Sequence, residues 1–146
     1  MQATTHGSAM RIALPVLLLA GWVAGLLGQR QGAIDTGYMD ITPPLMVLGL
    51  SLLFLGGATA RILRPASRRL RTGVLAGLAV LASMIAGYWV LALVYIDRPF
   101  GEQGGETWFS FLLESWFWIG VPLLLGSMLG AAGWMVSDLL ARARRR

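Results

Sequence analysis

Residues 74–96 read VLAGLAVLASMIAGYWVLALVYI, a run of twenty-three residues without one charged side chain. About 20 apolar residues in a helix span the hydrocarbon core of a bilayer, which is about 30 Å thick. No water in that core can satisfy backbone N–H and C=O groups, so a spanning segment has to bond them internally, as a helix does. This stretch therefore predicts a transmembrane helix, and the fold class depends on how many more the chain contains.

Three further apolar stretches surround it, at residues 12–28, 43–60 and 116–137. A chain of 146 residues is long enough for one domain. Hydrophobic residues make up 56% of it and charged residues 13%, whereas soluble domains carry about 25% charged residues. A small soluble domain cannot bury that much apolar surface. We therefore expect an all-α polytopic protein, a single membrane domain over residues 1–146 with four transmembrane helices.

The arginines predict the orientation. If the N-terminus is cytoplasmic, ten of the twelve arginines lie on the cytoplasmic side and six of the seven acidic residues lie outside. The positive-inside rule then places both termini in the cytoplasm, and we expect the protein in the inner membrane. Arg11 followed by residues 12–28 also fits a signal peptide, so the sequence leaves open whether that segment is cleaved. The clustered basic residues are topology anchors or sites for anionic lipid head groups: Arg61, Arg64, Arg68, Arg69, Arg71, Arg144 and Arg145.

Small residues recur at helical spacing in all four stretches. Transmembrane helices associate largely through close backbone approach, which small side chains permit. The positions that we expect at helix contacts are Gly21, Gly25, Gly73, Gly77, Gly126 and Gly130. Because small residues are more numerous than one four-helix bundle needs, we also expect some faces to contact a partner subunit.

The chain offers little chemistry for catalysis. It has no cysteine and one histidine, His6, in the polar N-terminal stretch, which argues against thiolate and histidine-rich metal sites. The central turns of the four stretches carry no ionisable residue, although such residues usually mark function inside a membrane. Asp138 and Arg142 are four residues apart, and we expect them to form an exposed pair of minor energetic value. We expect no enzyme activity, no cofactor and no nucleic-acid partner.

Residues 108–118 form an aromatic segment that contains one carboxylate, Glu114. One helix over residues 108–140 would be about 50 Å long, so we expect an interfacial segment at 108–114 before the spanning helix begins. Its candidate surface for a ligand or a partner consists of Trp108, Glu114, Trp116 and Trp118. A lipid, a quinone or a pigment would suit this surface. The alternative is an aromatic belt at the membrane interface with a solvated carboxylate.

Residues 37–49 read GYMDITPPLMVLG and are followed by LFLG at 53–56. This segment resembles the small membrane subunit of tripartite tricarboxylate transporters, in which a similar outer loop runs into a leucine-rich helix and a basic inner loop. The resemblance implies a four-helix accessory subunit beside a large transport subunit and a periplasmic binding protein. It implies no catalytic residue in this chain.

These observations favour a non-catalytic accessory subunit of a larger inner-membrane complex, with a secondary solute transporter as the leading case. Its expected partners are the lipid bilayer and a larger integral membrane subunit. The acidic loop at 97–107 either contacts a periplasmic partner or serves as a connector. The alternative is a structural subunit of an energy-transducing or pigment- or quinone-bearing complex. The third hypothesis is a membrane enzyme that acts on lipid. The acids and His6 form no recognisable catalytic set, which argues against it.

Overall fold

The computed structural model describes residues 3–36, 42–64, 69–95 and 116–143, which form four α-helices. These are α1 (Ala3–Thr36), α2 (Pro43–Leu63), α3 (Leu70–Tyr95) and α5 (Trp116–Ala143). Each contains an apolar window long enough to cross a membrane. The all-α class and the four membrane-length helices that the sequence predicts are therefore confirmed, and this fold is compatible with a multi-pass membrane protein.

The helices extend beyond the apolar stretches that predict them. α1 covers Ala3–Thr36, whereas the apolar stretch covers 12–28, and α5 continues past residue 137 to Ala143. Hydropathy marks the part of a helix that is apolar enough for lipid, while the backbone hydrogen bonds continue into the polar flanks. The membrane-length windows lie inside the helices, at Ala9–Gly32 in α1 and Gly120–Ala143 in α5.

The start of α2 shows how the local sequence sets a helix boundary. Thr42 is extended, with φ −69° and ψ 153°, and the prolines that follow it occupy the first turn, where a missing N–H leaves no helical bond unmade. The Thr42 carbonyl accepts the first bond from the Met46 N–H at 3.0 Å. At the other end the Arg64 N–H donates to the Ala60 carbonyl, and Pro65 follows in the sequence, where it disfavours further helix.

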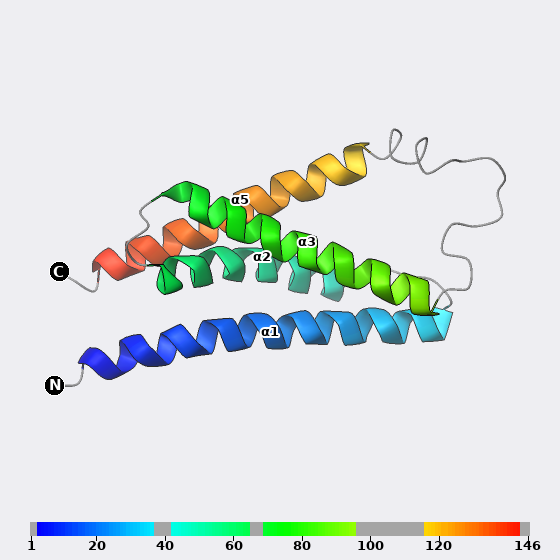
Figure 1. The fold of residues 1–146 in the computed structure, drawn as a ribbon, viewed down its shortest axis with the longest axis horizontal. Helices are drawn as coiled ribbons and strands as arrows, with labels where there is room; N and C mark the ends of the chain where they lie inside the picture. The colour runs from blue at the N-terminus through cyan, green and yellow to red at the C-terminus, as the bar shows by residue number, and fades with distance from the viewer. Residues whose placement is uncertain (1–2, 37–41, 65–68, 96–115, 144–146) are drawn as a thin grey trace.

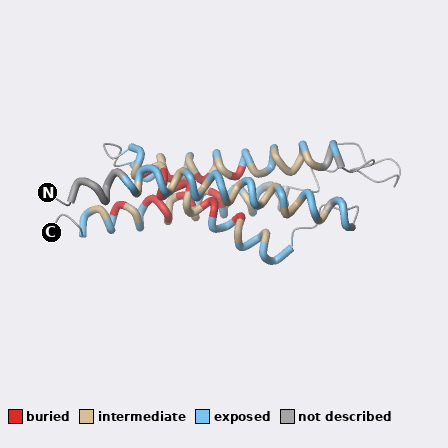
Figure 2. Tube along the Cα trace, turned by 90° about the horizontal axis from the view of Figure 1, so that it is seen from below, coloured by how far each residue is buried: buried red, intermediate tan, exposed pale blue. Residues whose placement is uncertain are grey.

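Successive helices run in opposite directions, so α1 begins and α5 ends at the same end of the bundle (Figure 1). We call this the terminal end; α2 finishes and α3 starts there as well. α2 and α3 each contact the other three helices, whereas α1 contacts α2 and α3 but not α5 within the described residues. Buried positions are concentrated in α2, α3 and α5 towards the terminal end (Figure 2).

Glycines bring α2, α3 and α5 into backbone contact. Gly57, Gly77 and Gly130 are all buried and come from these three helices in that order. A Cβ atom built on Gly130 would lie 2.8 Å from the Gly77 Cα, and one built on Gly57 would lie 2.9 Å from the Gly130 Cα. No side chain has room at this junction, so only glycine allows the three helices to meet here.

The α3–α5 contact extends in both directions from that junction. A Cβ on Gly73 would collide with the Gly130 carbonyl and with Trp134, and one on Gly77 would collide with the Gly126 carbonyl. The glycines that the sequence singles out in the third and fourth stretches, Gly73, Gly77, Gly126 and Gly130, thus lie opposite one another.

α1 packs against the bundle differently, with its glycines facing leucine side chains of α2. A Cβ on Gly21 would lie 2.7 Å from Leu52 Cδ2, and one on Gly25 would lie 3.6 Å from Leu48 Cδ2. The side chains of α2 fill the notches that these glycines leave. α1 is therefore held through side-chain packing along one face, and its membrane-length window contains no buried residue.

Candidate functional site

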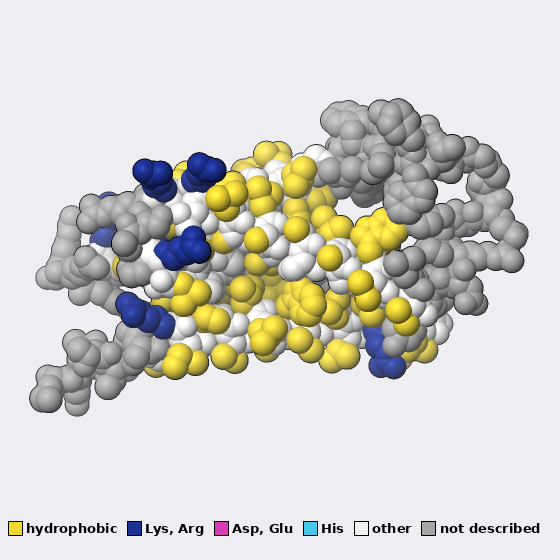
Figure 3. Space-filling model, viewed as in Figure 1, with side chains coloured by type: hydrophobic (Ala, Val, Ile, Leu, Met, Phe, Trp, Pro, Cys, Tyr) yellow, Lys and Arg dark blue, Asp and Glu magenta, His cyan; other side chains and the backbone are white. Residues whose placement is uncertain are grey.

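The structure places the basic residues of the predicted clusters in two environments. Arg64, Arg69 and Arg71 are exposed near the terminal end, and most of the arginine side chains drawn in Figure 3 gather there. Arg68, Arg144 and Arg145 lie outside the described residues. Arg61, which the sequence groups with these anchors, is instead buried, with 8% of its surface exposed.

Arg61 forms an ion pair with Asp138 that joins α2 to α5. Its Nε donates to Asp138 Oδ1 at 2.8 Å, and its Nη2 donates to the same oxygen at 2.6 Å. Asp138 is itself 5% exposed. Both residues belong to membrane-length helical windows, where an ionisable side chain is costly unless it is paired. This pair is the most polar feature of the described bundle interior.

Two further side chains complete the cluster. Arg142, one turn after Asp138, pairs through Nη2 with the second carboxylate oxygen, Oδ2, at 2.5 Å. The guanidinium carbon of Arg61 lies 5.7 Å from the centroid of the Trp134 ring, a geometry in which the ring face attracts the cation. The carboxylate is thus bound by guanidinium groups on both oxygens, and the buried cation contacts an aromatic ring.

The predicted pair between Asp138 and Arg142 is present, but it differs in burial from the expectation. Asp138 is not exposed, because Arg61 reaches it from the neighbouring helix across 77 positions of sequence. The sequence does contain a signal that points to Asp138, since it is the only acidic residue assigned to the cytoplasmic side. What it lacks is any indication of which arginine would face it.

The aromatic surface predicted at residues 108–118 lies largely outside the described residues. This holds for Trp108, for Glu114 and for the interfacial segment at 108–114. Trp116 and Trp118 belong to the first turn of α5, and the structure does not describe their side chains. Their role as a ligand or partner surface therefore stays a prediction.

The outward side of α3 carries a row of small side chains, which we call the α3 outer face: Ala79, Ala82, Ser83 and Ala86. All four are exposed, and their spacing places them within one side of the helix. The larger exposed residues Leu75 and Val90 lie above and below the row. The opposite side of α3 carries the buried glycines that contact α5. α3 therefore has small residues both inside and outside the bundle.

Comparison of the chain with protein-family models, with curated proteins and with solved structures finds no match. The described fold and geometry define an all-α, four-helix chain with membrane-length helices. The resemblance of residues 37–56 to a transporter subunit stays a prediction.

Proposed function

We propose that this chain is a non-catalytic accessory subunit of a larger inner-membrane complex, and that it binds an integral membrane partner through the α3 outer face. The observation that carries this proposal is the exposure of Ala79, Ala82, Ser83 and Ala86 on one side of a membrane-length helix. Small residues at such spacing are enriched where membrane helices approach closely.

Lipid alone does not require this arrangement. Lipid chains pack against leucine and valine as well as against alanine, so a purely lipid-facing side has no need of a row of small residues. Leu75 and Val90 stand at the two ends of the row, so the middle of this side of the helix carries the smaller side chains. A second helix that packs along the row can approach the α3 backbone closely and gain van der Waals contact along its length.

The polar atom of the α3 outer face is compatible with such a contact. Ser83 Oγ donates to the Val80 carbonyl at 2.7 Å, so its hydroxyl proton is already bonded within α3. A partner helix therefore needs no polar group at this position. The expected contact is apolar and depends on shape.

The interior contacts support the same proposal. The Gly57–Gly77–Gly130 junction brings three backbones together, and the guanidinium groups of Arg61 and Arg142 bind the Asp138 carboxylate. These groups are engaged in holding the bundle together. We infer that the chain acts through its outer surface, as an accessory subunit does.

The leading partner is the large subunit of a secondary solute transporter, on the resemblance of residues 37–56. The proposal includes both termini in the cytoplasm and the opposite end of the bundle outside, available to a periplasmic partner. The distribution of arginines supports this orientation, because the exposed basic residues Arg64, Arg69 and Arg71 lie near the terminal end.

Purification of the tagged chain from its native membranes in a mild detergent tests the proposal. Mass spectrometry identifies co-purifying proteins, and an absorption spectrum detects quinone or pigment. We expect a larger integral membrane protein in a fixed molar ratio and no chromophore. A chain that purifies alone would contradict the proposal, and a stoichiometric chromophore would favour a structural subunit of an energy-transducing complex.

A further inference from the structure

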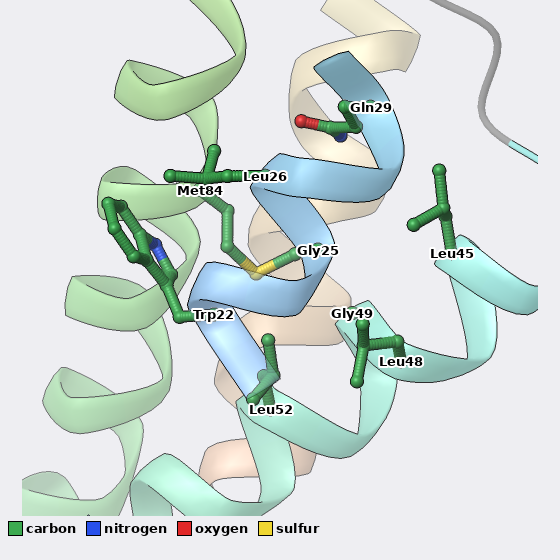
Figure 4. Close-up of a pocket in the computed structure, with 9 residues that line it drawn as sticks. All are labelled: Trp22, Gly25, Leu26, Gln29, Leu45, Leu48, Gly49, Leu52 and Met84. Atoms are coloured by element: carbon green, nitrogen blue, oxygen red, sulfur yellow. The ribbon is translucent and has the colours of Figure 1, made fainter. Parts of the chain in front are cut away.

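A small cavity lies between α1, α2 and α3, on the side of the bundle away from α5. Its volume is about 30 Å³. α1 contributes Trp22, Gly25, Leu26 and Gln29, and α3 contributes Met84, which extends across the cavity towards α1 and α2 (Figure 4). The α2 wall is Leu45, Leu48, Gly49 and Leu52. The lining is apolar apart from two side chains, Trp22 and Gln29, both on α1.

The indole N–H of Trp22 is buried and has no hydrogen-bond partner in the described protein. In Figure 4 the nitrogen edge of the ring faces the space that the Met84 side chain crosses. A buried donor without an acceptor is unfavourable, and native proteins usually satisfy such a group with protein or with ordered water. The cavity beside the ring is the place where an acceptor can lie.

Gln29 provides the second polar group. It lies seven residues after Trp22, so both side chains are on the same side of α1, about 10 Å apart along the axis. The Gln29 amide oxygen points towards the part of the cavity bounded by Leu26 (Figure 4). Gly25 lies between them in the sequence and has no side chain, so only its backbone lines the cavity there.

The volume limits what the cavity can enclose. A water molecule needs about 10–15 Å³ of such space and two to four polar partners. The cavity is therefore large enough for one or two waters and too small for a lipid chain or a ring. We propose that the cavity is a hydration site, in which one ordered water accepts a hydrogen bond from Trp22 Nε1 and donates to a second water, which donates to the Gln29 amide oxygen.

This site has a consequence for α1. α5 contacts α2 and α3 through glycine backbones, whereas α1 is held to the bundle by side-chain packing. The bound waters bridge only polar side chains of α1 itself. They satisfy the Trp22 donor without linking α1 to α2 or α3. α1 can then separate from the bundle without breaking a direct interhelical hydrogen bond at this site.

Nuclear magnetic resonance of the full chain in micelles, with ¹⁵N-labelled tryptophan, tests the proposal. The Trp22 indole signal is assigned by its loss in Trp22→Phe. We expect cross-relaxation between this N–H and water. Trp134 is the internal reference, because its indole N–H is also buried without a partner but its ring packs closely against α3. No water signal at Trp22, or equal signals at both indoles, would overturn the proposal.

Two variants test the role of Gln29. Gln29→Leu should abolish the water signal at Trp22, since the two waters lose their second protein partner. Gln31→Leu is the matched control, because Gln31 is exposed and its amide donates to Asp35 at 2.9 Å; this variant should leave the signal unchanged. A signal that persists in Gln29→Leu, or that disappears equally in Gln31→Leu, would contradict the assignment.

Discussion

Asp138 is bound by two guanidinium groups, one on each carboxylate oxygen. Arg61 approaches from α2 and Arg142 from the next turn of α5. The Arg61–Asp138 pair is inside the bundle, where removing one partner of an ion pair leaves the other charge buried and uncompensated. The pair therefore specifies how α2 and α5 are positioned against each other at the terminal end.

Asp138→Asn should lower the resistance of the protein to unfolding, because Arg61 would remain buried beside a neutral amide. Detergent-induced unfolding in mixed micelles, followed by circular dichroism, measures this as a lower midpoint. The double variant Arg61→Met with Asp138→Leu should recover most of the loss, since apolar replacement of both partners is often neutral. Asp35→Asn is the control, because Asp35 is exposed. An unchanged midpoint in Asp138→Asn would contradict this account.

The contacts of single residues were predictable from the sequence only where the contacting residues are close in sequence. Asp138 and Arg142 are four positions apart, and their pairing follows from helical geometry. The partner on α2 is 77 positions away, and any of several arginines around the inner loop satisfies the same charge pattern. Packing selects Arg61, because it is the basic residue still within α2, on the side that faces Trp134 and α5.

The crossing of α3 and α5, like that of α2 and α5, depends on glycine at its closest point. Obstacles to a Cβ on Gly130 are backbone atoms, including the Gly77 nitrogen at 2.9 Å. Backbone atoms cannot move aside by changing rotamer. By contrast, the obstacles along α1 are the ends of leucine side chains, which can. The two contacts should therefore respond differently to substitution.

Gly130→Ala should destabilise the protein by about 1–3 kcal/mol, since the added methyl group overpacks a closed contact. Gly120→Ala is the matched control on the same helix, because a Cβ at Gly120 meets no atom within 4 Å; it should change the stability by less than about 0.5 kcal/mol. The unfolding midpoint of each variant in mixed micelles measures the effect. Equal stability of the two variants would show that α3 and α5 do not meet at Gly130.

The four helices were predictable because each contains an apolar stretch of membrane length. Their ends were not, since α1 and α5 continue into polar sequence that hydropathy does not mark. The sequence also singles out the glycines, but it does not say which helices they join. Small residues look alike on every helix, so the pairing of Gly77 with Gly130 and of Gly21 with Leu52 requires the three-dimensional arrangement.

The molecule as a whole has a polar asymmetry between its two ends. Within the described residues, most exposed arginines lie near the terminal end, while Arg30 lies towards the opposite end, and the positive-inside rule assigns the more basic end to the cytoplasm. A reporter enzyme fused after Arg146 should therefore be active only if it works in the cytoplasm. Activity of a periplasm-specific reporter at the same position would reverse the proposed orientation. A cytoplasm-specific reporter at that junction provides the matched comparison.

Substitutions on the α3 outer face test the accessory-subunit proposal most directly. Ala82→Leu with Ala86→Leu fills the row of small residues without touching the interior, since both alanines are exposed. Ala20→Leu with Ala24→Leu is the matched control, because these alanines are also exposed and four residues apart, but on α1. All variants should be inserted and folded to the same extent, because no interior contact changes.

The measurement is the amount of the large membrane partner that co-purifies with each tagged chain from native membranes, relative to the wild type. We expect the α3 variant to lose most of the partner and the α1 variant to retain it. Full retention of the partner by the α3 variant, or its loss from the α1 variant alone, would contradict the assignment of the α3 outer face as the binding surface.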